Sequence, residues 1–139
     1  WSYVSPNPTP RPSLVGMVAP AAPELQILLF PLMAPGHIIP ITHMATLFAR
    51  RGVGCTIVTT PTCASLVRRD LLRATASGHT IALHLIELPS ADVGLPHGLD
   101  SLTMVTSPET NSRFFSALEL LRPTFERLLR ERRPDAVVT

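Results

Sequence analysis

Four short apolar runs, separated by segments with helical spacing, constrain the fold of this chain more than any other feature. The runs occupy residues 25–30, 54–60, 80–88 and 135–139. Each is rich in leucine, isoleucine or valine, as strands buried on both faces of a parallel sheet are. Strands that alternate with helices favour right-handed crossovers. We therefore predict an α/β fold with a Rossmann-like parallel sheet.

The segments between these runs carry the signals of helices. Apolar residues recur at helical spacing after Pro40, which we expect in the first helical turn, where no internal N–H donor is needed. Gly52 can supply a left-handed cap at the end of this helix. A second helix is predicted over 64–75. Ser107 can cap a third helix, which Pro123 is expected to kink or split.

The two ends of the chain differ from this pattern. Six of the fifteen prolines lie in residues 1–23, so we expect a disordered, Pro-rich leader there. Residues 24–139 are expected to form one domain. Because the chain stops at Thr139, inside its last predicted strand, we expect this domain to be truncated, as in a fragment of a longer protein.

Composition argues against several classes of function. The net charge is only +2, and the arginines lack interleaved aromatic residues, so we expect no nucleic-acid partner. No apolar run reaches the roughly 18 residues of a membrane span, and no secretory signal is evident, so we expect a cytoplasmic protein. Cys55 and Cys63 lack the spacing of a zinc site and are expected to be buried thiols.

The sequence PLMAPGH (31–37) links the first predicted strand to the first helix. Ligands of open α/β sheets bind beyond the carboxyl ends of the strands, where this turn lies. The N-terminus of the helix favours an anion such as phosphate, and its field favours a neutral imidazole at His37. A neutral imidazole can take a proton from a hydroxyl as a general base. A structural histidine, hydrogen-bonded to backbone in the turn, is the alternative.

Other catalytic and nucleotide-binding motifs are absent. The stretch APGHIIP (34–40) has one glycine where a dinucleotide fingerprint has three, which counts against an NAD(P)-binding domain. No Walker motif, zinc pair or GxSxG elbow is present. We therefore expect neither a cofactor nor a metal.

The stretch ELQILLFPLMAPGHIIPITHMATLFARRGVGCTIVTTP (24–61) resembles the opening of plant family 1 UDP-dependent glycosyltransferases, which glycosylate secondary metabolites. The blocks GLPHGLDSLTMVTSPE (94–109) and FFSALELLRPTFERLLRERRPDAVVT (114–139) extend this resemblance in family order. The most similar branch includes flavonoid, coumarin and triterpenoid glucosyltransferases. The resemblance implies a GT-B architecture, in which residues 24–139 belong to the N-terminal, acceptor-binding domain.

The same resemblance implies an inverting, metal-independent mechanism. His37 would deprotonate a hydroxyl of a small plant metabolite, such as a flavonoid or another phenolic, and the oxygen would attack the anomeric carbon of a UDP-sugar. Glucose is the expected sugar, and UDP-sugar is a co-substrate rather than a cofactor. Met33 and Ala34 are expected on the acceptor side of the cleft. Gly36 is expected either to allow close approach to sugar or diphosphate or to serve the turn.

The family's orienting aspartate is expected immediately beyond Thr139, and the sugar-nucleotide motif lies in a second domain. We therefore expect that this chain alone does not transfer sugar. We also expect the complete enzyme to be a monomer. A non-catalytic Rossmann-like remnant, or an interaction domain of a truncated gene, is the alternative hypothesis.

The remaining histidines and the paired phenylalanines have simpler interpretations. We expect His43 to be solvated on a helix and His84 to be a satisfied residue of the core or the sheet edge. His97 lies in a loop that could contact the acceptor. Phe114 and Phe115 are expected chiefly in the core.

Overall fold

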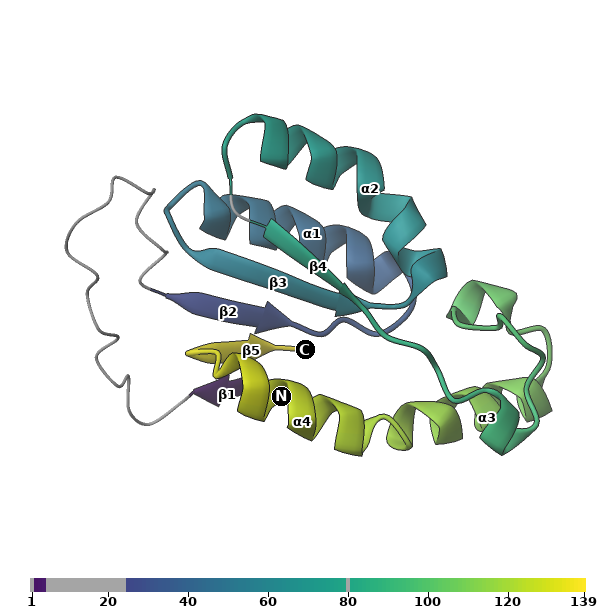
Figure 1. Ribbon diagram of the computed structural model, residues 1–139. Helices are drawn as coiled ribbons and strands as arrows, with labels where there is room; N and C mark the ends of the chain where they lie inside the picture. The colour runs from purple at the N-terminus through teal and green to yellow at the C-terminus, as the bar shows by residue number, and fades with distance from the viewer. Residues whose placement is uncertain (1, 5–24, 80) are drawn as a thin grey trace.

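Five strands form one sheet in the order β1-β5-β2-β3-β4 (Figure 1). This computed structural model describes residues 2–4, 25–79 and 81–139. The strands are β1 (Ser2–Val4), β2 (Gln26–Leu29), β3 (Gly54–Thr59), β4 (Ile81–Leu85) and β5 (Ala136–Val138). β2 pairs in parallel with both β3 and β5, and β3 pairs in parallel with β4. The parallel α/β sheet predicted from the sequence is therefore confirmed.

β1 was not predicted from the sequence. It pairs antiparallel with β5, with Tyr3 opposite Val137. It thus covers the edge of β5 that β2 leaves open. Apart from Ser2–Val4, the predicted Pro-rich leader (residues 1–23) lies outside the part of the chain that the structure describes.

Helices flank the sheet on both faces (Figure 1). α1 and α2 lie on one face, α4 lies on the other, and α3 continues the line of α4 beyond the ends of the strands. Two short 3-10 turns lie in the segment between β4 and α3. The bounds are α1 (Pro35–Ala49), α2 (Pro61–Ala76), η1 (Ala91–Val93), η2 (Leu102–Met104), α3 (Pro108–Glu119) and α4 (Arg122–Arg132).

The hydrophobic core lies between the central strands and the helices on each face. Leu29 of β2 and Ile57 of β3 are fully buried, as is Ile38 of α1. On the α4 side, the rings of Phe30 and Phe125 stack with their centroids 4.9 Å apart. This packing fixes the ends of β2 and β3, from which the candidate site is built.

α1 begins one turn earlier than the sequence predicted. Pro35 stands at the start of the helix, so Pro40 lies inside it and not in its first turn. Proline lacks the N–H that would bond the carbonyl of Gly36 four residues earlier. Both residues are exposed, so water can solvate that carbonyl. The correction places His37 within the first turn of α1.

The predicted break at Pro123 is confirmed. α3 ends at Glu119, and Pro123 lies in the first turn of α4. The predicted cap of α3 is also present, because Ser107 Oγ accepts a hydrogen bond of 3.1 Å from the N–H of Thr110. Proline at the start of a helix costs no internal hydrogen bond, so it separates two helices without destabilising either.

Arg133 ends α4 in the left-handed conformation, with φ of 44°. This conformation is unfavourable for a residue with a Cβ. We expect Arg133→Gly to raise the free energy of unfolding by about 0.5–1 kcal/mol after the greater chain entropy of glycine is subtracted. Arg132→Gly, inside the last turn, should lower it by up to about 1 kcal/mol. Urea denaturation measures both, and destabilisation by Arg133→Gly would contradict the assigned strain.

Candidate active site at the carboxyl edge of the sheet

The turns that follow β2 and β3 lie side by side at the carboxyl edge of the sheet. The two strands are paired in parallel, with Leu29 opposite Ile57, so both end at the same edge. α1 and α2 each start from this edge (Figure 1). Two helix N-termini, each with a partial positive charge, are therefore neighbours here.

His37 is exposed in the first turn of α1. Its backbone N–H donates to the carbonyl of Ala34 at 3.0 Å, and the N–H of Ile38 donates to the same oxygen at 3.0 Å. Within the described part of the chain, the imidazole itself has no hydrogen-bond partner. These contacts do not support a structural histidine held by the backbone of the turn.

The N-terminus of α1 has no side-chain cap. Ala34 is the N-cap residue and offers no side-chain hydrogen bond, and the first turn contains no acidic residue. The N–H groups at this end are therefore not covered by a carboxylate of the helix itself. Pro35 has no N–H and the N–H of His37 donates to Ala34, so the N–H of Gly36 is the group in this turn, among the described residues, that an anion outside the chain can interact with.

The other three predicted site residues differ in exposure. Gly36 is exposed and helical, it does not have a positive φ, and an added Cβ would meet nothing within 4 Å. A turn requirement therefore does not explain this glycine. Ala34 is partly buried. The side chain of Met33 is only 1% exposed and packs in the core, so it is not at the surface of the described chain.

Residues 100–102, which we call the 100–102 clamp, bind the turn after β2. The N–H of Leu102 donates to the carbonyl of Met33 at 2.8 Å. Ser101 Oγ donates to the same carbonyl at 3.4 Å. The side chain of Ser101 is fully buried, so this contact is shielded from water.

The clamp also binds the turn after β3. Thr60 Oγ1 donates to the carbonyl of Asp100 at 2.8 Å, and the N–H of Thr62 donates to Asp100 Oδ2 at 3.2 Å. Asp100 thus caps α2 from a segment 38 residues away in the chain. In the sequence these residues lie within the block 94–109, and no individual role was predicted for them. An adjacent acid and hydroxyl are common in exposed loops, and only the tertiary fold reveals that Asp100 and Ser101 are buried.

None of the other four histidines belongs to the turn after β2. His43 is exposed and lines a groove of about 360 Å³ between α1 and α2, together with Arg50 and Arg73. His97 is exposed in the loop before the clamp. His84 pairs with Val58, which lines a small gap under α4, so both residues lie on the face that α4 covers.

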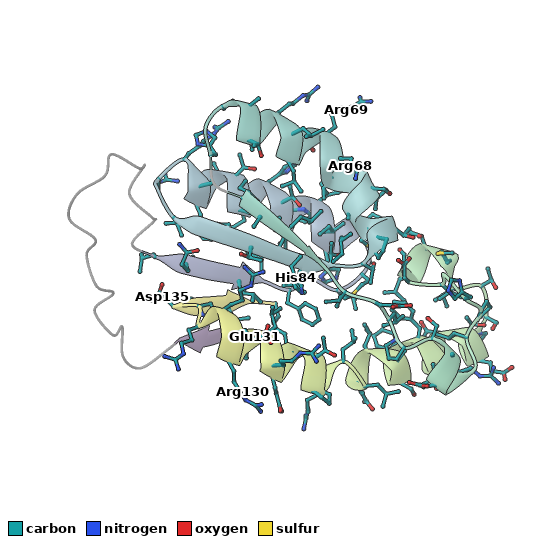
Figure 2. The ribbon with its side chains drawn as sticks, in the orientation of Figure 1. Arg68, Arg69, His84, Arg130, Glu131 and Asp135 are labelled. Carbon is teal, nitrogen blue, oxygen red and sulfur yellow. The ribbon has the colours of Figure 1, made fainter. Side chains whose placement is uncertain are left out.

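Charged side chains on the helices point away from the sheet (Figure 2). Arg68 and Arg69 lie on the outer side of α2, and Arg130 lies on the outer side of α4, where it pairs with Glu126 at 3.4 Å. Asp135 has a structural role, because its Oδ2 accepts a hydrogen bond of 2.7 Å from the N–H of Gln26. None of these groups belongs to the carboxyl edge.

The two cysteines are buried and free, as predicted. Burial raises the pKa of the Cys55 thiol to about 11, so this thiol stays protonated at neutral pH and is a poor nucleophile. Among the described residues, no three His, Cys, Asp or Glu side chains are grouped as a metal site would need. None of the described helices is long and apolar enough to cross a membrane.

Sequence comparison finds relatives among plant glucosyltransferases. The chain is 45% identical over 116 residues to solanidine UDP-glucose glucosyltransferase 1 of Solanum tuberosum, covering 81% of this chain and 23% of the relative. It is 40% identical over 124 residues to UDP-glucose flavonoid 3-O-glucosyltransferase 7 of Fragaria ananassa, covering 89% and 24%. The chain thus spans about a quarter of the length of these curated relatives. No family model matches it.

Structure comparison gives a consistent result. UGT73P12 of Glycyrrhiza uralensis, complexed with glycyrrhetinic acid 3-O-monoglucuronide, matches with a TM-score of 0.70 and 28% identity, covering 79% of this chain and 22% of that one. UGT89C1 of Arabidopsis thaliana, complexed with UDP-L-rhamnose, matches with a TM-score of 0.60 and 26% identity, covering 76% and 26%. The sheet with its flanking helices is therefore similar to part of each of these solved chains.

Proposed function

The chain belongs to the plant family 1 UDP-dependent glycosyltransferases, which have the GT-B fold, and we propose that it forms the acceptor-binding part of such an enzyme. The enzyme would transfer a sugar from a UDP-sugar to a hydroxyl of a small molecule. The observation that carries this proposal is the exposed imidazole of His37 at the carboxyl edge of the sheet, which has no hydrogen-bond partner among the described residues. This is the edge at which open α/β sheets bind ligands.

His37 acts as the general base in this proposal. Its imidazole takes the proton of the acceptor hydroxyl as the oxygen forms a bond to the anomeric carbon. The bond from that carbon to UDP breaks at the same time, so the configuration inverts and UDP leaves with the electron pair. The imidazolium that forms needs a carboxylate partner, as in other His–Asp pairs. The family resemblance assigns this role to an aspartate that is not among residues 1–139.

The neighbouring residues have separate roles. Gly36 leaves open space beside His37, where the sugar or diphosphate can approach the backbone. The uncapped N-terminus of α1 is suited to the negative charge of the diphosphate. Ala34 would adjoin the acceptor. Met33 is proposed to contribute through its backbone, because its side chain is buried in the core.

The class of substrate follows from the relatives. Their names specify glucose transfer to solanidine and to a flavonoid. We therefore propose glucose as the sugar and a hydroxylated plant metabolite, such as a flavonoid or another phenolic, as the acceptor. UDP-glucose is a co-substrate in this scheme, and no further cofactor is needed for the step.

Transfer can be tested by incubating the enzyme that contains this chain with UDP-glucose and a panel of flavonols, coumarins and triterpenes. We expect a product heavier than its acceptor by one hexose, and no turnover by residues 1–139 alone. Hydrolysis of UDP-glucose without any glycoside would contradict the proposal.

Gly36 offers a test that separates stability from function. Gly36→Ala should raise the free energy of unfolding by about 0.5–1 kcal/mol, because alanine favours a helix and its Cβ meets no atom of the chain. The same methyl group should lower kcat/KM for UDP-glucose by about tenfold, by blocking close approach. Thermal unfolding and initial rates measure the two effects. A stabilised variant with unchanged kcat/KM would show that Gly36 is not part of the site.

A further inference from the structure

The backbone that carries His37 is held by a segment that lies more than 60 residues away in the chain. The Met33 carbonyl accepts hydrogen bonds from both Leu102 and Ser101. The next carbonyl along the chain, that of Ala34, accepts from the N–H of His37. Two successive peptide groups therefore link the 100–102 clamp to the first turn of α1.

The other end of the clamp is fixed independently. Asp100 is bound to Thr60 and Thr62 at the start of α2, so the clamp is anchored to a second helix. Asp100 is 8% exposed and Ser101 is fully buried, which shields these hydrogen bonds from competing water. The clamp consequently fixes the start of α1 relative to the start of α2.

We propose that the 100–102 clamp is a positioning element for His37, with the N–H of Leu102 as its principal donor. This inference rests on the proposed function, because it assigns a role in setting the direction from which the imidazole meets the acceptor hydroxyl. The clamp acts through the Met33 and Ala34 peptide groups. A base displaced by a fraction of an ångström loses much of its effect on the rate.

Leu102→Pro removes the principal donor, and the ring Cδ that replaces the amide hydrogen pushes the Met33 carbonyl away. Leu102 is the first residue of η2, and Ser101 before it is already extended, with φ of −140° and ψ of 144°, as a residue before proline prefers. The matched control is Leu102→Ala, which shortens the same side chain but keeps the N–H. The difference between the two variants therefore reports the loss of the hydrogen bond together with the displacement of the Met33 peptide group.

We expect Leu102→Pro to lower kcat about tenfold relative to Leu102→Ala, with KM for acceptor and UDP-glucose within about twofold. The difference should vanish for a nitrophenol acceptor that is ionised at the assay pH, because that acceptor needs no base. Equal kcat values for the two variants would overturn the proposal. An equal defect with the ionised acceptor would also overturn it, since general damage to the fold lowers both rates alike.

Ser101→Ala is the second variant if Leu102→Pro does not fold. It removes the weaker bond to Met33, and we expect kcat to fall about threefold with the same dependence on acceptor ionisation. Ser90→Ala is its control, because the Ser90 side chain is buried in the same segment but donates to the carbonyls of Leu88 and Leu99 and not to that of Met33. An equal effect of both serine variants would overturn the proposal. Loss of activity in His37→Ala without any effect of the clamp variants would refute the clamp alone, whereas an unaffected His37→Ala would refute the proposed function.

Discussion

Replacing His37 with alanine in the enzyme that contains this chain is expected to lower kcat by a factor of about 10²–10⁴, the usual contribution of a general base. KM for acceptor and donor should change little, because the imidazole acts on the proton that moves in the transition state. The fold should be unaffected, since the side chain is exposed and has no hydrogen-bond partner within the described residues. Initial rates with UDP-glucose and a flavonol measure the loss.

His43→Ala is the matched control for this experiment. His43 is exposed on the same helix, but it lines the groove between α1 and α2 and not the carboxyl edge. We expect the kcat of the His43→Ala variant to stay within about twofold of the kcat of the unchanged enzyme. Equal losses of kcat in the two variants would mean that α1 tolerates no substitution. An unchanged kcat in His37→Ala would show that His37 is not the base.

Replacing Phe114 with alanine is expected to have the largest effect on stability. Its side chain is fully buried and is the largest such side chain of the described core. Truncation removes buried apolar surface and leaves a cavity, so the free energy of unfolding should fall by about 3–5 kcal/mol. Urea denaturation of the enzyme, followed by circular dichroism, measures the change.

Phe115→Ala separates burial from ring contact. The two rings form an edge-to-face pair with centroids 6.0 Å apart, and either substitution removes that pair. Phe115 is 43% exposed, so its truncation should cost about 1–2 kcal/mol, including the pair. The larger loss of unfolding free energy in Phe114→Ala then measures the effect of burying that side chain. Equal losses in the two variants would contradict the position of Phe114 in the core.

The order of the elements could be predicted because each depends on local signals. Continuous apolar runs mark parallel strands, and Ser107 and Pro123 mark helix boundaries through their own chemistry. The first residue of α1 was placed wrongly because two prolines, Pro35 and Pro40, could each begin a helix. Tertiary packing of Ile38 in the core favours the earlier start.

The candidate site could be predicted only in part. His37 was proposed because a glycine–histidine pattern after the first strand is a local signal, and its role as the base stays a prediction. The clamp was missed because its hydrogen bonds join residues that are far apart in the chain, such as Ser101 and Met33. The expected position of Met33 on the acceptor side of the cleft stays a prediction for its backbone, because its side chain is buried by packing that the sequence pattern does not specify.

The dependence of kcat on phenol acidity tests the role of His37 most directly. A series of substituted phenols, compared between the unchanged enzyme and His37→Ala at one pH, reports whether this imidazole removes the acceptor's proton. We expect the gap between the two enzymes to shrink steadily as the phenols become more acidic and to close for those already ionised. A gap of constant size across the series would show that His37 does not take the proton.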